Sequence, residues 1–133
     1  GYQIVEKYIS LDVHRMRNVF FNLLRNAIKY SHRGTMIYVR GIKVTQGVSL
    51  IEIENRGIGV PEGWHERIFN LYQRADNARR LTTPGSGIGL YISRKIIEAH
   101  SGRLYLAHNH EPTIFAIELP KHTGEGNENR LDR

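Results

Sequence analysis

The chain has 133 residues, of which 40% are hydrophobic and 24% are charged, values that fit one globular domain with a single core. It contains no cysteine, which excludes disulfides and thiolate metal sites and suits a reducing compartment. The net charge of +6 indicates an anionic partner, either nucleic acid or the phosphates of a small ligand, although a solvated basic surface would give the same balance.

No apolar run approaches the roughly 20 residues needed to cross a bilayer. The first ten residues also lack the basic and apolar regions of a signal peptide. We therefore expect a cytoplasmic domain, and any membrane anchor of the parent protein would lie outside this sequence. Arginines cluster in two places, Arg15, Arg17 and Arg25, and then Arg74, Arg79 and Arg80.

Residues 12–31 are predicted to form an amphipathic helix that starts at the N-cap residue Asp12 and ends before Gly34. At about 100° per residue its apolar positions fall on one stripe. The stripe consists of Val13, Met16, Phe20, Leu23, Leu24 and Ala27.

The next segments predict a β-hairpin. Residues 35–44 alternate and are β-branched, residues 46–47 look like a turn, and residues 48–54 form a second strand. Because successive side chains of a strand point to opposite faces of the sheet, we expect Ile51, Ile53 and Asn55 to share one face. The amide of Asn55 would then lie at the bottom of an apolar pocket.

The second half of the chain predicts a short helix over residues 64–72, a mobile polar loop over 74–84 and a helix that opens at a glycine cluster. We expect that helix to stop at Gly102 and to be followed by strands over 104–106 and 113–119. Its predicted apolar stripe is Ile88, Tyr91, Ile92, Lys95 through its stem, Ile96 and Ala99. Residues 1–121 form the domain and residues 122–133 a disordered tail. This order favours an α+β two-layer sandwich with helices on one face of a mainly antiparallel sheet.

The first predicted helix has a second, polar flank. Asn22, Asn26 and Lys29 are spaced at i, i+4 and i+7 and fall within about 60° of one another. An amide oxygen suits Mg²⁺, and a lysine can pair with phosphate oxygens. Taken alone, a solvated polar surface explains the pattern equally well.

Two glycine clusters follow. Gly57 and Gly59 come directly after a strand and permit a sharp turn and close ligand approach, although most such pairs are plain turns. Residues 85–89 open a helix, where bare backbone N–H groups form an anion site. No Walker sequence is present, and the glycines do not follow the first strand as a Rossmann fingerprint requires.

Four segments in this order resemble the boxes of the catalytic domain of sensor histidine kinases, in the gyrase–Hsp90–histidine kinase–MutL superfamily. Residues 22–31 look like the N box, 55–59 the G1 box, 68–76 the F box and 85–90 the G2 box. The resemblance covers about residues 10–120. It implies a Bergerat-type sandwich with a mainly antiparallel mixed sheet, about three helices on one face and a mobile ATP lid over about residues 75–84.

The resemblance also implies roles for individual residues. Asn26 would bind the Mg²⁺ that bridges the ATP phosphates, with Asn22 supporting the metal or its water. Lys29 would pair with phosphate, Tyr30 would border the ribose or adenine, and Arg74 would reach the phosphate end. The remaining nucleotide-binding candidates are Asn55, Gly57 and Gly59 in the G1 box, and Gly85, Ser86, Gly87, Gly89 and Leu90 in the G2 box.

Asn55 departs from the family pattern, which has Asp at this position to accept the adenine amino proton. The amide of Asn55 can still accept that proton and can donate to a ring nitrogen, but it carries no charge. A charge-assisted hydrogen bond is worth roughly twice a neutral one. We therefore expect weakened but retained ATP binding. The alternative is a non-catalytic pseudokinase that serves as an interaction module.

The implied activity is transfer of the γ-phosphoryl group of ATP–Mg²⁺ to a histidine on a separate helical dimerisation domain, and from there to a response regulator. None of the seven histidines has the setting of the phosphoacceptor. A gyrase-type ATPase would carry a glutamate general base where this chain has Asn22, so slow hydrolysis is expected. We do not expect nucleic acid as a partner, and we expect a monomeric isolated domain from a homodimeric parent. Leu71, Tyr72 and Leu81 either dock on the helical domain or belong to the core.

Overall fold

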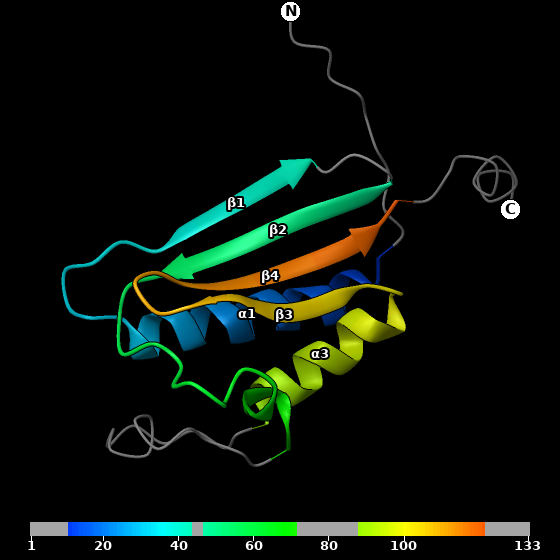
Figure 1. Ribbon diagram of the computed structural model, residues 1–133. Helices are drawn as coiled ribbons and strands as arrows, with labels where there is room; N and C mark the ends of the chain where they lie inside the picture. Colours follow the sequence, from blue (N-terminus) through cyan, green and yellow to red (C-terminus); the bar gives the residue numbers. More distant parts are fainter. Residues whose placement is uncertain (1–10, 44–46, 72–87, 122–133) are drawn as a thin grey trace, which may run out of the picture.

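The computed structural model describes residues 11–43, 47–71 and 88–121, which form a sheet layer and a helical layer (Figure 1). The elements are α1 (Val13–Tyr30), β1 (Tyr38–Lys43), β2 (Val48–Asn55), the 3₁₀ helix η1 (Arg67–Phe69), α3 (Gly89–Ala99), β3 (Arg103–Asn109) and β4 (Thr113–Pro120). The predicted α+β two-layer sandwich is confirmed.

The four strands pair in the order β1-β2-β4-β3, and every pairing is antiparallel. The predicted hairpin is confirmed as β1 and β2, and the two strands expected near the end of the chain are present and longer than predicted. Within the described strands the sheet is therefore antiparallel throughout rather than mixed. The register pairs Ile53 with Phe115 and Asn55 with Thr113 across the two central strands.

Helix α1 begins where the sequence predicts, because the Asp12 side chain accepts a hydrogen bond from the backbone N–H of Arg15 at 3.1 Å. Its predicted apolar stripe is wrong at two positions. Val13 is 64% exposed because the first turn extends beyond the core, whereas Val19, which the prediction omitted, is fully buried. The buried residues are Met16, Val19, Leu23 and Ala27.

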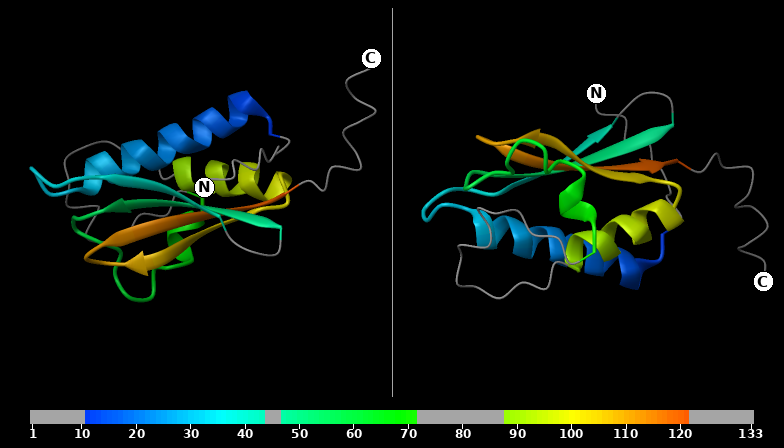
Figure 2. Two further views of the ribbon diagram at one scale, coloured as in Figure 1. Left: turned by 90° about the horizontal axis from the view of Figure 1, so that it is seen from above. Right: turned by 60° about the horizontal axis from the view of Figure 1, so that its bottom comes forward.

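Helix α3 lies beside α1 on the same face of the sheet (Figure 2). Its predicted stripe is right at Ile96, which packs against the core, but wrong at Ile92, which is 42% exposed, and it omitted the buried residues Ser93 and Ile97. The hydroxyl of Ser93 accepts a hydrogen bond from Asn22 of α1 at 3.2 Å. A small polar pair at a helix–helix contact leaves no trace in hydrophobic periodicity, and this explains the error.

The end of α3 differs from the predicted glycine stop. Ser101, and not Gly102, takes the left-handed conformation, with φ of 61°, while the N–H of Gly102 donates to the carbonyl of Ile97 at 2.9 Å. Glycine is required at 102 for a different reason, because a β-carbon there would overlap the backbone oxygen of Glu118.

His100 caps this helix end. Its Nδ1 lies 2.8 Å from the carbonyl of Ile96, and its Nε2 accepts a hydrogen bond from the N–H of Asp12 at 3.0 Å. The end of α3 is thereby joined to the start of α1.

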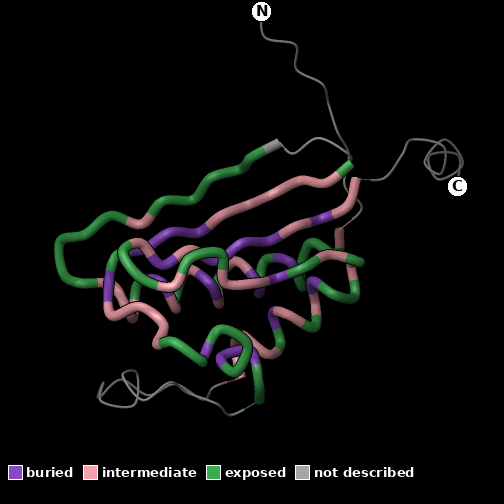
Figure 3. Tube along the Cα trace, in the orientation of Figure 1, coloured by how far each residue is buried: buried purple, intermediate pink, exposed green. Residues whose placement is uncertain are grey.

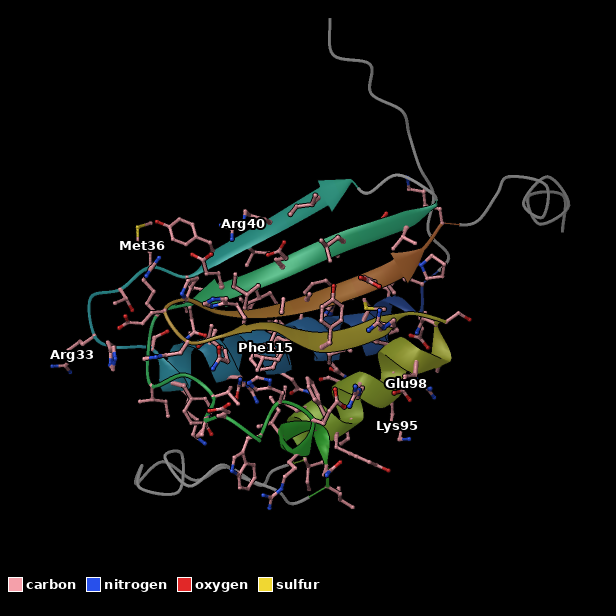
Figure 4. All side chains as sticks on the ribbon, viewed as in Figure 1. Arg33, Met36, Arg40, Lys95, Glu98 and Phe115 are labelled. Atoms are coloured by element: carbon pink, nitrogen blue, oxygen red, sulfur yellow. The ribbon has the colours of Figure 1, made fainter. Side chains whose placement is uncertain are left out.

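The short helix expected over residues 64–72 is a three-residue 3₁₀ turn. Its Phe69 packs edge-on against Phe115, with ring centroids 6.1 Å apart, and Phe115 lies between the sheet and the helices (Figure 4). Buried residues occur on α1, η1 and α3 and on the strands β2, β3 and β4 (Figure 3). The loop predicted over residues 74–84, the lid and the tail at 122–133 lie outside the described residues. Among the described helices, none combines the length and apolar character needed to cross a membrane.

Candidate functional site

The polar flank of α1 meets the start of α3 at Asn22 and is not in open solvent. Asn22, Asn26 and Lys29 are all half-buried. Asn22 donates to Ser93, and a β-carbon built on Gly89 would lie 3.7 Å from Cγ of Asn22. The start of α3, where the second glycine cluster ends, therefore meets the middle of α1.

The first glycine cluster lies against the C-terminal end of α1. We call residues 56–60 the glycine turn. The N–H of Ile58 donates to the carbonyl of Tyr30 at 3.1 Å, and the N–H of His32 donates to the carbonyl of Arg56 at 2.9 Å. Gly57 is buried, and a β-carbon at this position would overlap the carbonyl oxygen of Tyr30. Only glycine permits this contact between the two backbones.

Asn55 ends β2 directly before the glycine turn and is 4% exposed. It lies on the same face of the strand as the core residue Ile53, as the period of two predicts. In the part of the chain that the structure describes, no residue forms a hydrogen bond with its side-chain amide. Because buried polar groups nearly always have a partner, this amide is suited to a ligand.

The cross-strand neighbour of Asn55 is Thr113, which is also 4% exposed. Its hydroxyl donates to the carbonyl of Asn109 at 3.2 Å, so its oxygen remains able to accept. Sequence reasoning missed Thr113, because only the register of β2 and β4 brings it beside Asn55.

Glu54 lies on the opposite face of β2 from Asn55, because successive side chains of a strand alternate, and it cannot substitute for the missing carboxylate at position 55. It forms an ion pair with Arg40 of β1 at 2.6 Å. The hydrogen bond to Glu54 is the main cause of the raised pKa of the Arg40 guanidinium. This carboxylate is therefore engaged away from the helices.

The turn between β3 and β4 contacts the end of the glycine turn through hydrogen bonds. The N–H of Val60 donates to the carbonyl of Asn109 at 2.8 Å, and the Asn109 amide lies 3.4 Å from the carbonyl of Val60. Gly59 has φ of 70°, and a β-carbon there would lie 2.6 Å from Cδ2 of His110. No sequence signal marks Asn109 or His110, which come from a turn far along the chain.

The other predicted residues stand as follows. Nζ of Lys29 lies 5.2 Å from the centroid of the Tyr30 ring, and Leu90 is half-buried against the core. Arg74, Gly85, Ser86 and Gly87 lie outside the described residues. The structure thus brings together α1, the glycine turn and the start of α3.

The donor set fits a magnesium nucleotide better than a protein-bound metal cluster. Among the described residues there is no group of three or more His, Cys, Asp or Glu side chains that could hold a metal. Mg²⁺ is commonly held by only one or two protein oxygens together with substrate phosphates and water. The half-buried amide of Asn26 fits that requirement.

Comparison with known proteins gives a consistent result. Residues 11–123 match the family model described as histidine kinase-, DNA gyrase B-, and HSP90-like ATPase. The chain is 36% identical over 115 residues to the sensor protein VanS of Enterococcus faecium, covering 84% of this chain and 29% of VanS. It is 36% identical over 110 residues to the probable sensor kinase SilS of Salmonella typhimurium, covering 83% of this chain and 22% of SilS. The chain therefore spans less than a third of the length of these relatives.

Solved structures show the same arrangement. The nucleotide-free catalytic domain of histidine kinase ThkA matches with a TM-score of 0.72 and 29% identity, covering 85% of this chain and 70% of that one. ThkA in complex with the response regulator protein TrrA matches with a TM-score of 0.64 and 28% identity. The match covers 84% of this chain and 30% of the ThkA chain. Full-length ShkA in complex with AMPPNP shares the fold, with a TM-score of 0.74 at 23% identity. The match covers 89% of this chain and 24% of the ShkA chain.

Proposed function

The chain belongs to the histidine kinase-, DNA gyrase B-, and HSP90-like ATPase family, and from this premise we propose that it binds ATP with Mg²⁺ and transfers the γ-phosphoryl group to a histidine on a separate helical dimerisation domain. One observation carries the proposal. The polar flank of α1 runs from the glycine turn to the start of α3, with Tyr30 against Gly57 at one end and Asn22 against Gly89 nearer the middle. These contacts are about 12 Å apart along the helix, at about 1.5 Å per residue.

Asn55 and Thr113 would hold the base at one end of this site. Both are buried, and Gly57 and Gly59 give the backbone room to turn beside them. Tyr30, at the end of α1, would border the base or ribose. The unpartnered amide of Asn55 supports this assignment, because a bound base would supply the missing hydrogen bonds.

The polar flank of α1 would serve the phosphates. Asn26 would hold Mg²⁺, which when bound neutralises charge on the phosphate oxygens. Lys29 would pair with a phosphate, and Asn22, oriented by Ser93, would position water or metal through its oxygen. Backbone N–H groups at the start of α3 would donate hydrogen bonds to phosphate oxygens from the other side. In such a reaction the protein acts mainly through positioning and electrostatic stabilisation.

Transfer to a protein is favoured over hydrolysis. Asn22 cannot act as a general base toward water, because an amide does not take up a proton at neutral pH. The sensor kinases that this chain resembles are about three to four times as long as the chain, which leaves room for a phosphoacceptor domain in the parent protein.

Two partners follow from this proposal. One is the helical dimerisation domain of the same parent protein, and the other is a response regulator, as ThkA has in its complex with TrrA. Leu71 is 42% exposed, which favours the docking role considered for it over a place in the core. Tyr72 and Leu81 lie outside the described residues. The isolated chain is proposed to be a monomer without affinity for nucleic acid.

A second candidate is a non-catalytic interaction module of the pseudokinase type. It is favoured by the neutral Asn55 in place of the family's usual carboxylate. The two proposals differ in whether nucleotide is bound at all.

The test is a calorimetric titration of the chain with ATP in Mg²⁺. Saturable binding that requires Mg²⁺ and is weakened at least about tenfold in Asn26→Ala is expected, since one charge-assisted metal contact is worth about 1.5–3 kcal/mol. Asn18→Ala is the matched control, because Asn18 lies on the same helix and is exposed. Absence of saturable binding at millimolar nucleotide would instead support the interaction module. ATP turnover by the isolated chain that is lost in Asn22→Ala would contradict transfer to a protein acceptor.

A further inference from the structure

The chemistry of Asn55 bears on which bases the site accepts. Its side chain is 4% exposed and follows Ile53, which is 2% exposed on the same face of β2. In the described part of the chain no hydrogen bond fixes its amide. The amide is therefore a buried recognition group without a protein partner.

An amide differs from a carboxylate in what it can recognise. It carries an acceptor oxygen and a donor NH₂ group side by side, whereas an ionised carboxylate only accepts. Turning the amide by about 180° exchanges its donor and acceptor, and nothing among the described contacts opposes that turn. Asn55 can thus present either order of donor and acceptor to a base.

A purine presents one of two complementary edges at positions 6 and 1. Adenine has a donor at its 6-amino group and an acceptor at N1, whereas hypoxanthine and guanine have an acceptor at the 6-oxo group and a donor at N1. Each edge matches one orientation of the amide, in the way that asparagine pairs with an adenine edge in DNA. A carboxylate at this position would face the 6-oxo group as acceptor against acceptor.

We propose that Asn55 makes the base site tolerant of the group at the purine 6-position, so that it binds 6-oxopurine nucleoside triphosphates about as well as ATP. This inference rests on the proposed function, because it assumes that a nucleotide base meets Asn55.

The neighbouring groups are compatible with both bases. The hydroxyl of Thr113 donates its hydrogen to Asn109, so toward a ligand it offers an acceptor, which suits both the 6-amino group and a protonated N1. The nearest carboxylate on β2, that of Glu54, lies on the other face in its ion pair with Arg40. No carboxylate from this strand therefore opposes a 6-oxo group.

The test compares the binding of ATP and ITP, both with Mg²⁺, by calorimetry on the chain as it stands. ITP carries the 6-oxo group without the additional 2-amino group of GTP and so isolates the 6-position. We expect the two dissociation constants to agree within about fivefold. In Asn55→Asp we expect ATP to be favoured over ITP by at least about 20-fold, because unpaired or opposed buried polar groups cost about 5- to 150-fold in affinity.

The controls separate this inference from the proposed function. Asn18→Asp, on the exposed face of α1, should leave the ATP-to-ITP ratio unchanged. Asn55→Ala removes both the donor and the acceptor of the amide and should weaken the binding of ATP and ITP equally. It is the substitute variant if Asn55→Asp does not fold. A preference of the unmodified chain for ATP of about 50-fold or more would overturn the inference and leave the proposed function intact. Failure of both nucleotides to bind would overturn the proposed function itself.

Discussion

Gly57→Ala is expected to force apart the glycine turn and the end of α1. The new β-carbon would overlap the carbonyl oxygen of Tyr30, which accepts a hydrogen bond from the N–H of Ile58 at 3.1 Å. Because the obstacle is main chain and not a flexible side chain, the backbones must separate. Losing this hydrogen bond and the adjacent one from His32 to Arg56 costs about 1 kcal/mol each, and overpacking adds about 1–3 kcal/mol. We therefore expect a total destabilisation of about 3–5 kcal/mol.

Two other glycines give matched controls in a urea-denaturation assay followed by Trp64 fluorescence. Gly63 has φ of 83° and no atom within 4 Å of a built β-carbon, so Gly63→Ala should cost only the left-handed strain of about 1–2 kcal/mol. Gly41 has open space without positive φ, so Gly41→Ala should be neutral or stabilise by up to about 1 kcal/mol. If Gly57→Ala proves no more damaging than Gly63→Ala, the close backbone contact does not exist as described.

Three further predictions concern single contacts. Ser93→Ala removes the acceptor of the Asn22 amide and should lower the free energy of unfolding by about 1 kcal/mol. A double-mutant cycle with Asn22→Ala should show a coupling energy of at least about 0.5 kcal/mol, and additive effects of the two substitutions would argue against the hydrogen bond. Asp12→Ala should destabilise by about 1 kcal/mol in thermal unfolding while Asp12→Asn changes little, because both Asp and Asn cap a helix. The pKa of Tyr105 is raised by burial and then by its hydrogen bond to Glu118. The neutral phenol therefore stabilises the fold below its ordinary pKa of about 10, and this contribution is lost as the pH rises through the folded value. Denaturation between about pH 8 and pH 11 should show a shallower alkaline loss of stability in Tyr105→Phe, and an unchanged slope would contradict this assignment.

The parts of the fold that the sequence predicted are those with strong local signals. The cap at Asp12 fixed the start of α1, because its side chain bonds within its own first turn. The hairpin of β1 and β2 followed from the alternating, β-branched residues 35–44 and the turn after them, and the period of two placed Asn55 on the same face of β2 as Ile53. These features depend on neighbours within a few residues and need no knowledge of the tertiary structure.

The errors arise where distant segments determine the outcome. The buried face of α3 includes Ser93 as well as Ile97, and the hydroxyl of Ser93 is partnered there by Asn22 of another helix. Thr113 lies beside Asn55 through strand register, which no single segment encodes. At the end of α3, position 102 requires glycine because the backbone of Glu118 approaches it closely, and the left-handed residue is Ser101.

Helix α1 contributes residues both to the hydrophobic core and to the candidate nucleotide site, so a change in the packing of one affects the geometry of the other. The helix buries Val19 and Leu23 completely and carries Asn26 on the adjacent flank. With side chains the helix has a radius of about 5–6 Å, so a rotation of about 20° to relieve a packing change moves the end of Asn26 by about 2 Å. Metal and phosphate contacts tolerate only about 0.5 Å of displacement. Repacking beneath α1 should therefore impair nucleotide binding well before it unfolds the domain, because the packing of Val19 and Leu23 in the core sets the direction in which Asn26 points.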